Sequence, residues 1–330
     1  MLRFLFAVCT LLLLSIGPVH ALVQRAYVSA LTGNDSNTAT DCQATAPCRW
    51  FAGAISVVAS KGEIVAMDSG AYGQVTITKS VAIVGAPGVY AGITAFASYG
   101  VMIATPGVDV VLRGLTINGL GGSDGIYMTA GSSLLVQDCV ISNFTNAGLY
   151  VGATARLTIV DSLFKGNFYG VAIAGNAQTT FISGSRLVHN NQGLAAVANG
   201  ASVESRVDVS RSELIGNNFG AYVDAQSSGL TELNIKDSAV SGNNYGIYGY
   251  ASSGGVTRVS ASRNLVSHNA GQALVASGSG AKLVASGNEV THNGTGFVQN
   301  ASAVLQTTGD NISTDNTTPT SGSITTLSKF

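Results

Sequence analysis

The chain has 330 residues, of which 46% are hydrophobic and only 10% are charged. This composition excludes intrinsic disorder over most of the chain, because it supplies enough apolar side chains for an extended core. The formal net charge of -1 also excludes a strong field for nucleic acid or anionic lipid, whose phosphates bind clustered Lys and Arg. We therefore expect no nucleic-acid partner.

Residues 1–21 have the pattern of a secretory signal peptide. Arg3 precedes an apolar run from Phe4 to Leu14, and the small residue Ala21 ends the segment. The alternative is a membrane anchor, but the apolar run is shorter than the roughly 20 residues that a bilayer span requires. The sequence predicts a secreted or periplasmic protein with no membrane span in its mature chain.

Three cysteines follow the signal segment. Cys42 and Cys48 lie close together in DCQATAPC, so we expect them to form a disulfide in an oxidising compartment. Cys139 is then unpaired and is interpreted as a small apolar side chain of the core. Three thiols without His at matching spacing make a poor zinc site, and the sequence predicts no metal centre.

A repeat occupies most of the remaining chain. Copies start at Leu157, Phe181, Val207, Leu233, Val259 and Leu283, which are 24, 26, 26, 26 and 24 residues apart. In each copy, Ser or Asn is followed five residues later by Asn, and three residues after that usually by Gly. The copies with this spacing are Ser162/Asn167/Gly170, Ser185/Asn190/Gly193, Ser212/Asn217/Gly220, Ser238/Asn243/Gly246 and Asn288/Asn293/Gly296; in the remaining copy, Asn264 and Asn269 lead to Gln272.

The repeat predicts a parallel β-helix. Each copy contains short alternating segments separated by turn residues, and it has no helical stripe. Looser copies start at Leu134 and near Val110, so at least eight coils are expected. Stacked coils pair each strand with the same strand one repeat later, at about 4.8 Å. The repeated Asn would then form one column at a turn, with amides bonded along the stack.

On this repeat, the chain resembles right-handed parallel β-helix proteins of the pectin-lyase-like superfamily, over roughly residues 63–305. The resemblance implies an all-β fold, a single-stranded right-handed β-helix (solenoid), with an N-terminal capping helix. The expected divisions are a cap over 22–62 with its helix at 49–60, a β-helix over 63–304, and a Ser/Thr-rich cap or tail over 305–330.

Charged residues fall into columns when the 26-residue copies are aligned. One column contains Arg206, Glu232 and Arg258, and another contains Arg211, Asp237 and Arg263. Opposite charges on neighbouring coils stabilise the stack, so we interpret both columns as structural.

A second set of polar residues occupies the turns. Asp138 and Asp161 share a turn position in successive coils, so their carboxylates could bind calcium or act as a glycosidase pair. The favoured interpretation is that each carboxylate accepts backbone hydrogen bonds in its own turn. His268 and His292 are likewise in column, with His189 further away, and we interpret them as surface turn residues.

Aromatic residues form an outward strip after the turn glycine. Alternation places Ile126, Met128, Leu149 and Val151 inside the coil and the tyrosines between them outside. Sugar rings stack on such faces, whereas the alternative is a ladder in which the rings only support one another. The candidate ligand residues are Tyr127, Tyr150, Phe219, Tyr222, Asp224, Tyr245, Tyr248 and Tyr250, with Ala172 and Ala195 interrupting the strip.

The resemblance raises three functions. The leading prediction is a monomer that presents this surface to a polysaccharide or cell-envelope glycan, without a cofactor. The alternatives are a lyase or hydrolase of acidic polysaccharides, using Asp138, Asp161 or Asp224, and an adhesin-like scaffold. Calcium is expected only for a lyase.

The sequence does not supply the motifs of the related enzymes. The Asn-Thr-Asp, Asp-Asp, Gly-His-Gly and Arg-Ile-Lys motifs of polygalacturonases and the Asp-Pro-His-Asp run of alginate epimerases do not occur. A pectate-lyase-like set can be assembled only loosely, from Asp208, Asp224 and Arg206.

Overall fold

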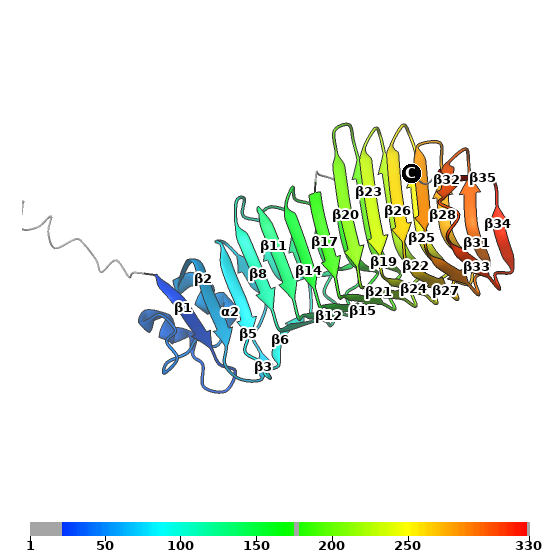
Figure 1. Ribbon diagram of the computed structural model, residues 1–330. Helices are drawn as coiled ribbons and strands as arrows, with labels where there is room; N and C mark the ends of the chain where they lie inside the picture. The colour runs from blue at the N-terminus through cyan, green and yellow to red at the C-terminus, as the bar shows by residue number, and fades with distance from the viewer. Residues whose placement is uncertain (1–21, 175–177, 329–330) are drawn as a thin grey trace, which may run out of the picture.

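The structure is a computed structural model that describes residues 22–174 and 178–328; the expected signal peptide at residues 1–21 lies outside them. The described chain winds into coils that stack along one axis, from the N-terminal cap to the C-terminal strands (Figure 1). Each coil contributes a strand to each of three parallel sheets, here called A, B and C. This arrangement confirms the expected all-β parallel β-helix.

Sheet A has 13 strands. They are β1 (Val23–Val28), β2 (Val58–Ala66), β5 (Val81–Gly85), β8 (Asp109–Arg113), β11 (Ser133–Gln137), β14 (Arg156–Val160), β17 (Gln178–Ser183), β20 (Glu204–Ser210), β23 (Leu230–Lys236), β26 (Val256–Ser262), β29 (Ala281–Ser286), β32 (Val304–Thr307) and β35 (Ile324–Thr326).

Sheets B and C have 11 strands each. Sheet B contains β3 (Gly70–Ala71), β6 (Ala91–Ala95), β9 (Leu115–Gly119), β12 (Val140–Ser142), β15 (Leu163–Lys165), β18 (Arg186–Val188), β21 (Glu213–Ile215), β24 (Ala239–Ser241), β27 (Leu265–Ser267), β30 (Glu289–Thr291) and β33 (Ile312–Thr314). Sheet C contains β4 (Val75–Ile77), β7 (Tyr99–Ile103), β10 (Asp124–Met128), β13 (Ala147–Val151), β16 (Tyr169–Ala174), β19 (Gln192–Asn199), β22 (Phe219–Gln226), β25 (Tyr245–Ala251), β28 (Gln272–Ser277), β31 (Thr295–Asn300) and β34 (Thr318–Ser321).

The strand register follows the repeat. Val207 pairs with Leu233, and Leu233 pairs in turn with Val259. Alternation points these side chains into the coil, where Leu233 is fully buried and Val207 and Val259 are nearly so. The core is therefore a continuous apolar column inside the coils.

The asparagine column is confirmed as a hydrogen-bonded ladder. The side-chain oxygen of Asn190 accepts from both the backbone nitrogen and Nδ2 of Asn167, at 3.0 and 3.1 Å. The same pair of bonds recurs down the stack to Asn316. Since the amides from Asn167 to Asn293 are buried, the ladder satisfies polar groups that would otherwise destabilise the turn.

A parallel ladder runs through the Ser positions of the repeat and includes Cys139. The hydroxyl of Ser162 accepts from the backbone nitrogen of Cys139, and that of Ser185 accepts from the backbone nitrogen of Ser162, both at 3.2 Å. Cys139 is buried at the start of this column, and burial raises the pKa of its thiol to about 12. The thiol is thus a small, protonated side chain of the interior, as the sequence predicts.

Left-handed backbone conformations explain the polar turn residues. Between sheets A and B, one residue per coil has φ between 48° and 67°; these residues are Gly114, Asp138, Asp161, Gly184, Arg211, Asp237, Arg263 and Gly287. Between sheets B and C, the corresponding residues are Asn143, Gly166, His189, Gly216, Gly242, His268, His292 and Asp315, with φ between 54° and 68°. Gly adopts this region freely, and Asn, Asp and His are enriched there among other residues.

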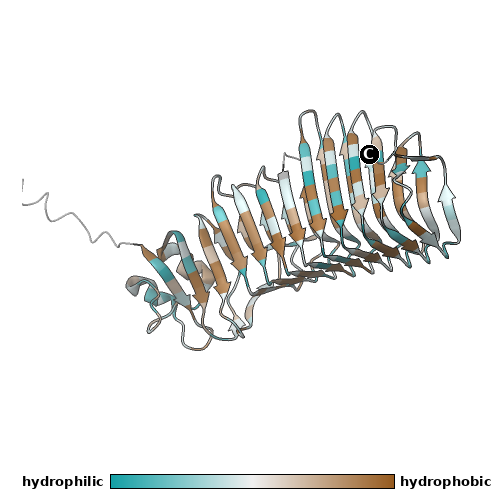
Figure 2. Cartoon of the chain, viewed as in Figure 1, coloured by the Kyte–Doolittle hydropathy of each residue, from teal (hydrophilic) through white to brown (hydrophobic). Residues whose placement is uncertain are grey.

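The charge columns are formed in part. Glu232 accepts from Arg206 and from Arg258, each at 3.0 Å, and Arg263 donates both Nε and Nη2 to Asp237. Arg211 instead donates to Ser183 Oγ at 2.7 Å. Figure 2 shows hydrophilic bands along β20, β23 and β26, the strands that carry the first column.

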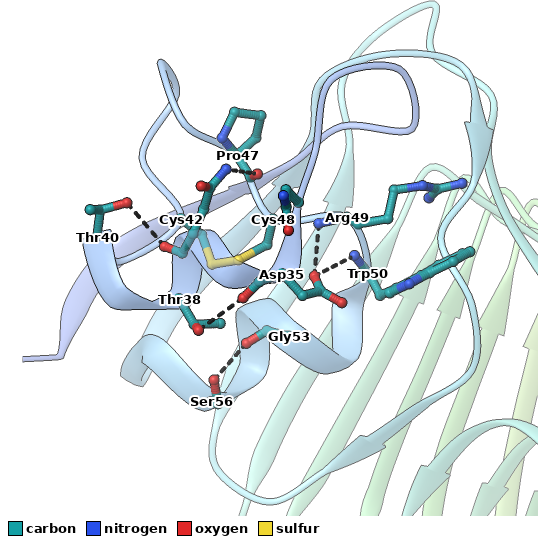
Figure 3. Close-up of a disulfide and its surroundings, with 12 residues drawn as sticks. Asp35, Thr38, Thr40, Cys42, Pro47, Cys48, Arg49, Trp50, Gly53 and Ser56 are labelled. Atoms are coloured by element: carbon teal, nitrogen blue, oxygen red, sulfur yellow. Dashed lines mark hydrogen bonds between the residues drawn. A yellow bond between two sulfur atoms is a disulfide. The ribbon is translucent and has the colours of Figure 1, made fainter.

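The N-terminal cap differs in detail from the expected one. Its helix α2 spans Phe51–Val57, shorter than the predicted 49–60, because Val58 has extended geometry and begins strand β2. A 3-10 helix, η1 (Asp35–Thr40), precedes it. Figure 3 shows the Cys42–Cys48 disulfide beside Asp35, whose Oδ1 accepts from the backbone nitrogens of Arg49 and Trp50 at 2.8 and 3.1 Å. The disulfide and this carboxylate together fix the entry to α2.

Residues 304–326 continue the strand pattern. Leu305 of β32 pairs with Leu283 of the preceding coil and with Ile324 of β35. The Ser/Thr-rich C-terminal segment therefore contributes strands to all three sheets, and the paired strands of the β-helix run past residue 304.

Candidate ligand-binding face

The outer face of sheet C carries the predicted aromatic strip. In β10 and β13, Ile126, Met128, Leu149 and Val151 are fully buried, while Tyr127 and Tyr150 between them are half-buried. Alternation thus directs the tyrosines outward. Although they point outward, the two tyrosines are partly buried, because each ring covers part of its neighbour.

Three rings form the tyrosine stack, defined here as Tyr99, Tyr127 and Tyr150. The ring centres of Tyr99 and Tyr127 lie 4.1 Å apart, and those of Tyr127 and Tyr150 lie 5.1 Å apart, with nearly parallel planes. Tyr99 is not among the ligand residues predicted from the sequence. It is not in register with Tyr127: the strand partner of Tyr127 is Met102, and that of Tyr99 is Asp124. The ring of Tyr99 reaches Tyr127 diagonally, which column alignment alone does not reveal.

The tyrosine stack ends in a depression beside the capping helix. This hollow of about 490 Å³ is lined in part by Ile55 of α2, Gln74, Tyr99 and Met102. Its size lies in the range of small-ligand sites in proteins. One end of the aromatic face is therefore concave, with an apolar wall and one side-chain amide, that of Gln74.

Four further rings form the aromatic cluster, defined as Phe219, Tyr222, Tyr245 and Tyr248. Phe219 stacks on Tyr245 with centres 4.6 Å apart, and Tyr222 stacks on Tyr248 at 5.9 Å. Edge-to-face contacts at 5.3 to 5.8 Å join the two stacks. The structure thus brings together four of the predicted ligand residues.

Two alanines separate the stack from the cluster. Tyr150, Ala172, Ala195 and Tyr222 pair in succession across β13, β16, β19 and β22. Three strand steps correspond to about 14 Å between Tyr150 and Tyr222. The two alanines are 7% and 4% exposed, so they form a narrow floor of small, largely covered side chains that interrupts the ladder of rings.

Asp224 lies at the edge of the aromatic cluster, in register with Tyr250. It is 2% exposed, and its Oδ2 accepts from Gln226 Nε2 at 2.5 Å and from the Tyr222 hydroxyl at 3.5 Å. Within the described residues, the buried Oδ1 has no hydrogen-bond partner. Burial raises the pKa of Asp224, and burial together with the nearby Asp224 charge raises the pKa of Tyr222.

The other predicted acidic pair lies at a corner between sheets A and B. Asp138 and Asp161 are exposed, have left-handed backbones, and line a shallow hollow of about 290 Å³ with Arg186. His268 and His292 stack with ring centres 5.0 Å apart at the next corner. Over residues 22–174 and 178–328, no three His, Cys, Asp or Glu side chains gather in a group that could hold a metal ion.

Comparisons with known proteins agree on the fold. A family model described as a right-handed β-helix region matches residues 99–259. The crystal structure of pectate lyase Pel9A superposes with a TM-score of 0.53 and 15% identity, covering 94% of this chain and 78% of that one. No curated protein matches the chain. At this low identity, the likeness to the lyase shows the fold alone.

Proposed function

We propose that the outer face of sheet C in this right-handed parallel β-helix binds a polysaccharide. The observation that carries the proposal is the pairing of two aromatic groups, the tyrosine stack and the aromatic cluster, across an alanine floor. Stacked rings offer flat apolar faces with polar edges, which match the faces of pyranose rings. A chain of several sugar units would lie along the stack axis and contact both groups.

The edge groups support the same proposal. The Tyr222 hydroxyl and the Gln226 amide lie beside the aromatic cluster, each held by the buried Asp224 carboxylate, so hydroxyl groups of a ligand would find their remaining acceptors and donors there. At the opposite end, in the hollow beside α2, Gln74 Nε2 donates to the carbonyls of Ala97 and Tyr99, and its amide oxygen would accept from a ligand hydroxyl.

Export from the cytoplasm would give the protein access to such a polysaccharide. Disulfides persist in oxidising compartments, and Cys42–Cys48 is one. The helices found over residues 22–174 and 178–328 lack the length and apolar character needed to cross a bilayer. Secretion or a periplasmic location, directed by residues 1–21, is part of the proposal.

A glycan array probed with the purified protein tests the proposal. We expect retention on a subset of polysaccharides, and a loss of about tenfold or more in affinity when Tyr222→Ala is combined with Tyr248→Ala. Tyr222→Phe with Tyr248→Phe keeps both ring contacts and should retain most binding. Tyr90→Ala is the matched control, because Tyr90 is 52% exposed and lies outside sheet C. Unchanged affinity in the double alanine variant would disprove the proposal.

Catalysis is the second candidate function, with Asp224 as its acid, because this carboxyl lies beside Tyr222 at the edge of the aromatic cluster and burial raises its pKa. Since Asp224 is 2% exposed, a substrate would have to displace its neighbours to reach it. Incubation with uronate polysaccharides, with and without calcium, would then yield unsaturated products or new reducing ends. These products should disappear in Asp224→Asn. Their absence with the wild-type protein would leave glycan binding as the function, and a failure of binding as well would favour a structural scaffold.

A further inference from the structure

A second depression lies on a different sheet from the tyrosines. It occupies the outer face of sheet A over β17, β20 and β23, and its volume is about 420 Å³. The side chains that define it are Phe181, Ser183, Asp208, Ser210, Asn234 and Lys236. Its volume lies within the range of small-molecule sites.

Phe181 supplies an apolar platform at one end of this depression. It pairs with Thr158 on one side and Asp208 on the other, and both of these neighbours in the outward column are polar. The ring is 45% exposed although it lies within a strand. A phenyl ring held outward in this way contributes little to the core and presents a flat face to a ligand.

Polar groups follow Phe181 along the same column. Asn234 Nδ2 donates to Asp208 Oδ1 at 2.9 Å, so each side chain is held in place by the other. This bond uses one carboxylate oxygen and one amide donor. The second carboxylate oxygen and the amide oxygen are the kind of acceptors that pair with neighbouring hydroxyls on a sugar ring.

Cationic donors border the other side. Lys236 lines the depression directly, and Arg211 donates to Ser183 at 2.7 Å. On the flanking column, the charges of Arg206, Glu232 and Arg258 are already engaged in ion pairs. Glu204 also pairs with Arg206, so the two arginines of this column are balanced by two carboxylates, and the Lys236 ammonium provides donors to the depression beside them.

We propose that this depression is a second carbohydrate-binding site, which holds one or two sugar rings with their apolar face on Phe181. Asp208 and Asn234 accept from ring hydroxyls, and Lys236 donates to a hydroxyl or ring oxygen. Because the site lies on sheet A and the tyrosines lie on sheet C, one chain could link two glycan strands. The site does not depend on the tyrosine face for its structure.

Isothermal titration with cellohexaose, xylohexaose and hexagalacturonate tests this site. For at least one of these probes, we expect Phe181→Ala to remove one binding event per chain and Lys236→Ala to weaken it by about tenfold. Phe181→Tyr keeps the ring and should retain binding. Ser260→Ala is the matched control, because Ser260 is exposed in the same outward column beyond the depression.

The double variant Tyr222→Ala with Tyr248→Ala separates this inference from the proposed function. Binding that survives in this variant and is lost on adding Phe181→Ala supports the second site, whatever the role of the tyrosines. Binding that is unchanged by Phe181→Ala in the wild-type background overturns the second site. An absence of binding to all three probes in the wild-type protein overturns it as well.

Discussion

The side-chain oxygen of Asn243 lies 2.8 Å from the backbone nitrogen of Asn217 and 3.1 Å from its Nδ2, 26 residues earlier in the chain. Asn243 in turn donates to Leu214 and Asn269 through its own Nδ2. One buried amide thus joins three coils. Each coil supplies the hydrogen-bond acceptor for buried N–H groups of the preceding coil.

Replacing Asn243 should destabilise the protein strongly. Asn243→Ala leaves the buried backbone nitrogen of Asn217 without its acceptor and leaves Asn217 Nδ2 with the Leu187 carbonyl alone, so we expect the free energy of unfolding to fall by about 3 kcal/mol. Chemical denaturation followed by circular dichroism measures the change. The control is Asn244→Ala, because the neighbouring Asn244 is exposed and its one side-chain bond, to Asn218, lies at the surface. Equal losses in the two variants would show that the ladder has no special role.

Asp224 should make the protein more stable in acid. Burial raises its pKa in the folded protein, so the folded state holds the proton more tightly than the unfolded state. The free energy of unfolding therefore falls as the pH rises from the ordinary carboxyl pKa of 3.8 through the raised value. Asp224→Asn removes this dependence and should stabilise the protein at neutral pH, by on the order of 1 kcal/mol. Thermal melts of both proteins across pH 4 to about 7 test the sign, and a wild-type protein that is relatively weaker at the acidic end contradicts it.

Asp68 should show the opposite behaviour. Burial pushes its pKa upward, but hydrogen bonds from Ser29, Tyr72 and the backbone of Ala30 outweigh burial and lower the pKa to about 2. Its stabilising effect is thus complete above the ordinary value of 3.8 and is lost as the pH falls towards about 2.

The variant Asp68→Asn tests this effect at neutral pH. We expect it to lower the free energy of unfolding by about 2 kcal/mol, since it weakens several charged hydrogen bonds in the cap. Asp315→Asn is the control, because Asp315 is an exposed corner residue and Asn tolerates its left-handed backbone. If the two variants unfold alike at neutral pH, the network around Asp68 does not stabilise the cap.

We expect substitutions of Asp161 to change the stability of the protein through the backbone conformation that this position requires. Its φ is 48°, so Asp161→Gly should be neutral or stabilising, whereas Asp161→Val should cost about 1 to 2 kcal/mol. Denaturant titration of both variants measures the difference. Equal stability of the two variants would contradict the backbone argument, and loss of polysaccharide cleavage in both folded variants would indicate a catalytic role for the carboxylate.

Local patterns in the sequence determined the coil and its register. A spacing of 24 to 26 residues, alternating apolar positions and a repeated Asn are sufficient, because each coil contacts only its neighbours and every strand pairs with its own copy. The same alignment correctly directed Tyr222 and Tyr248 to one face, and their rings stack there.

The tertiary structure alone decided which side chains meet across columns. The ring of Tyr99 stacks on Tyr127 from a diagonal position, and the Asp224 side chain is buried by its neighbours. Phe181 lines a hollow together with Lys236. These relationships depend on the reach and rotamers of side chains from adjacent coils, and a repeat spacing contains no information on either. The Ser/Thr-rich C-terminal segment retains one part of the repeat: Asn311 and Asn316 occupy the ladder positions and accept from Asn288 and Asn293. Its strands lack the buried apolar alternation of the earlier coils, and they pair through backbone hydrogen bonds, which require no particular side chain.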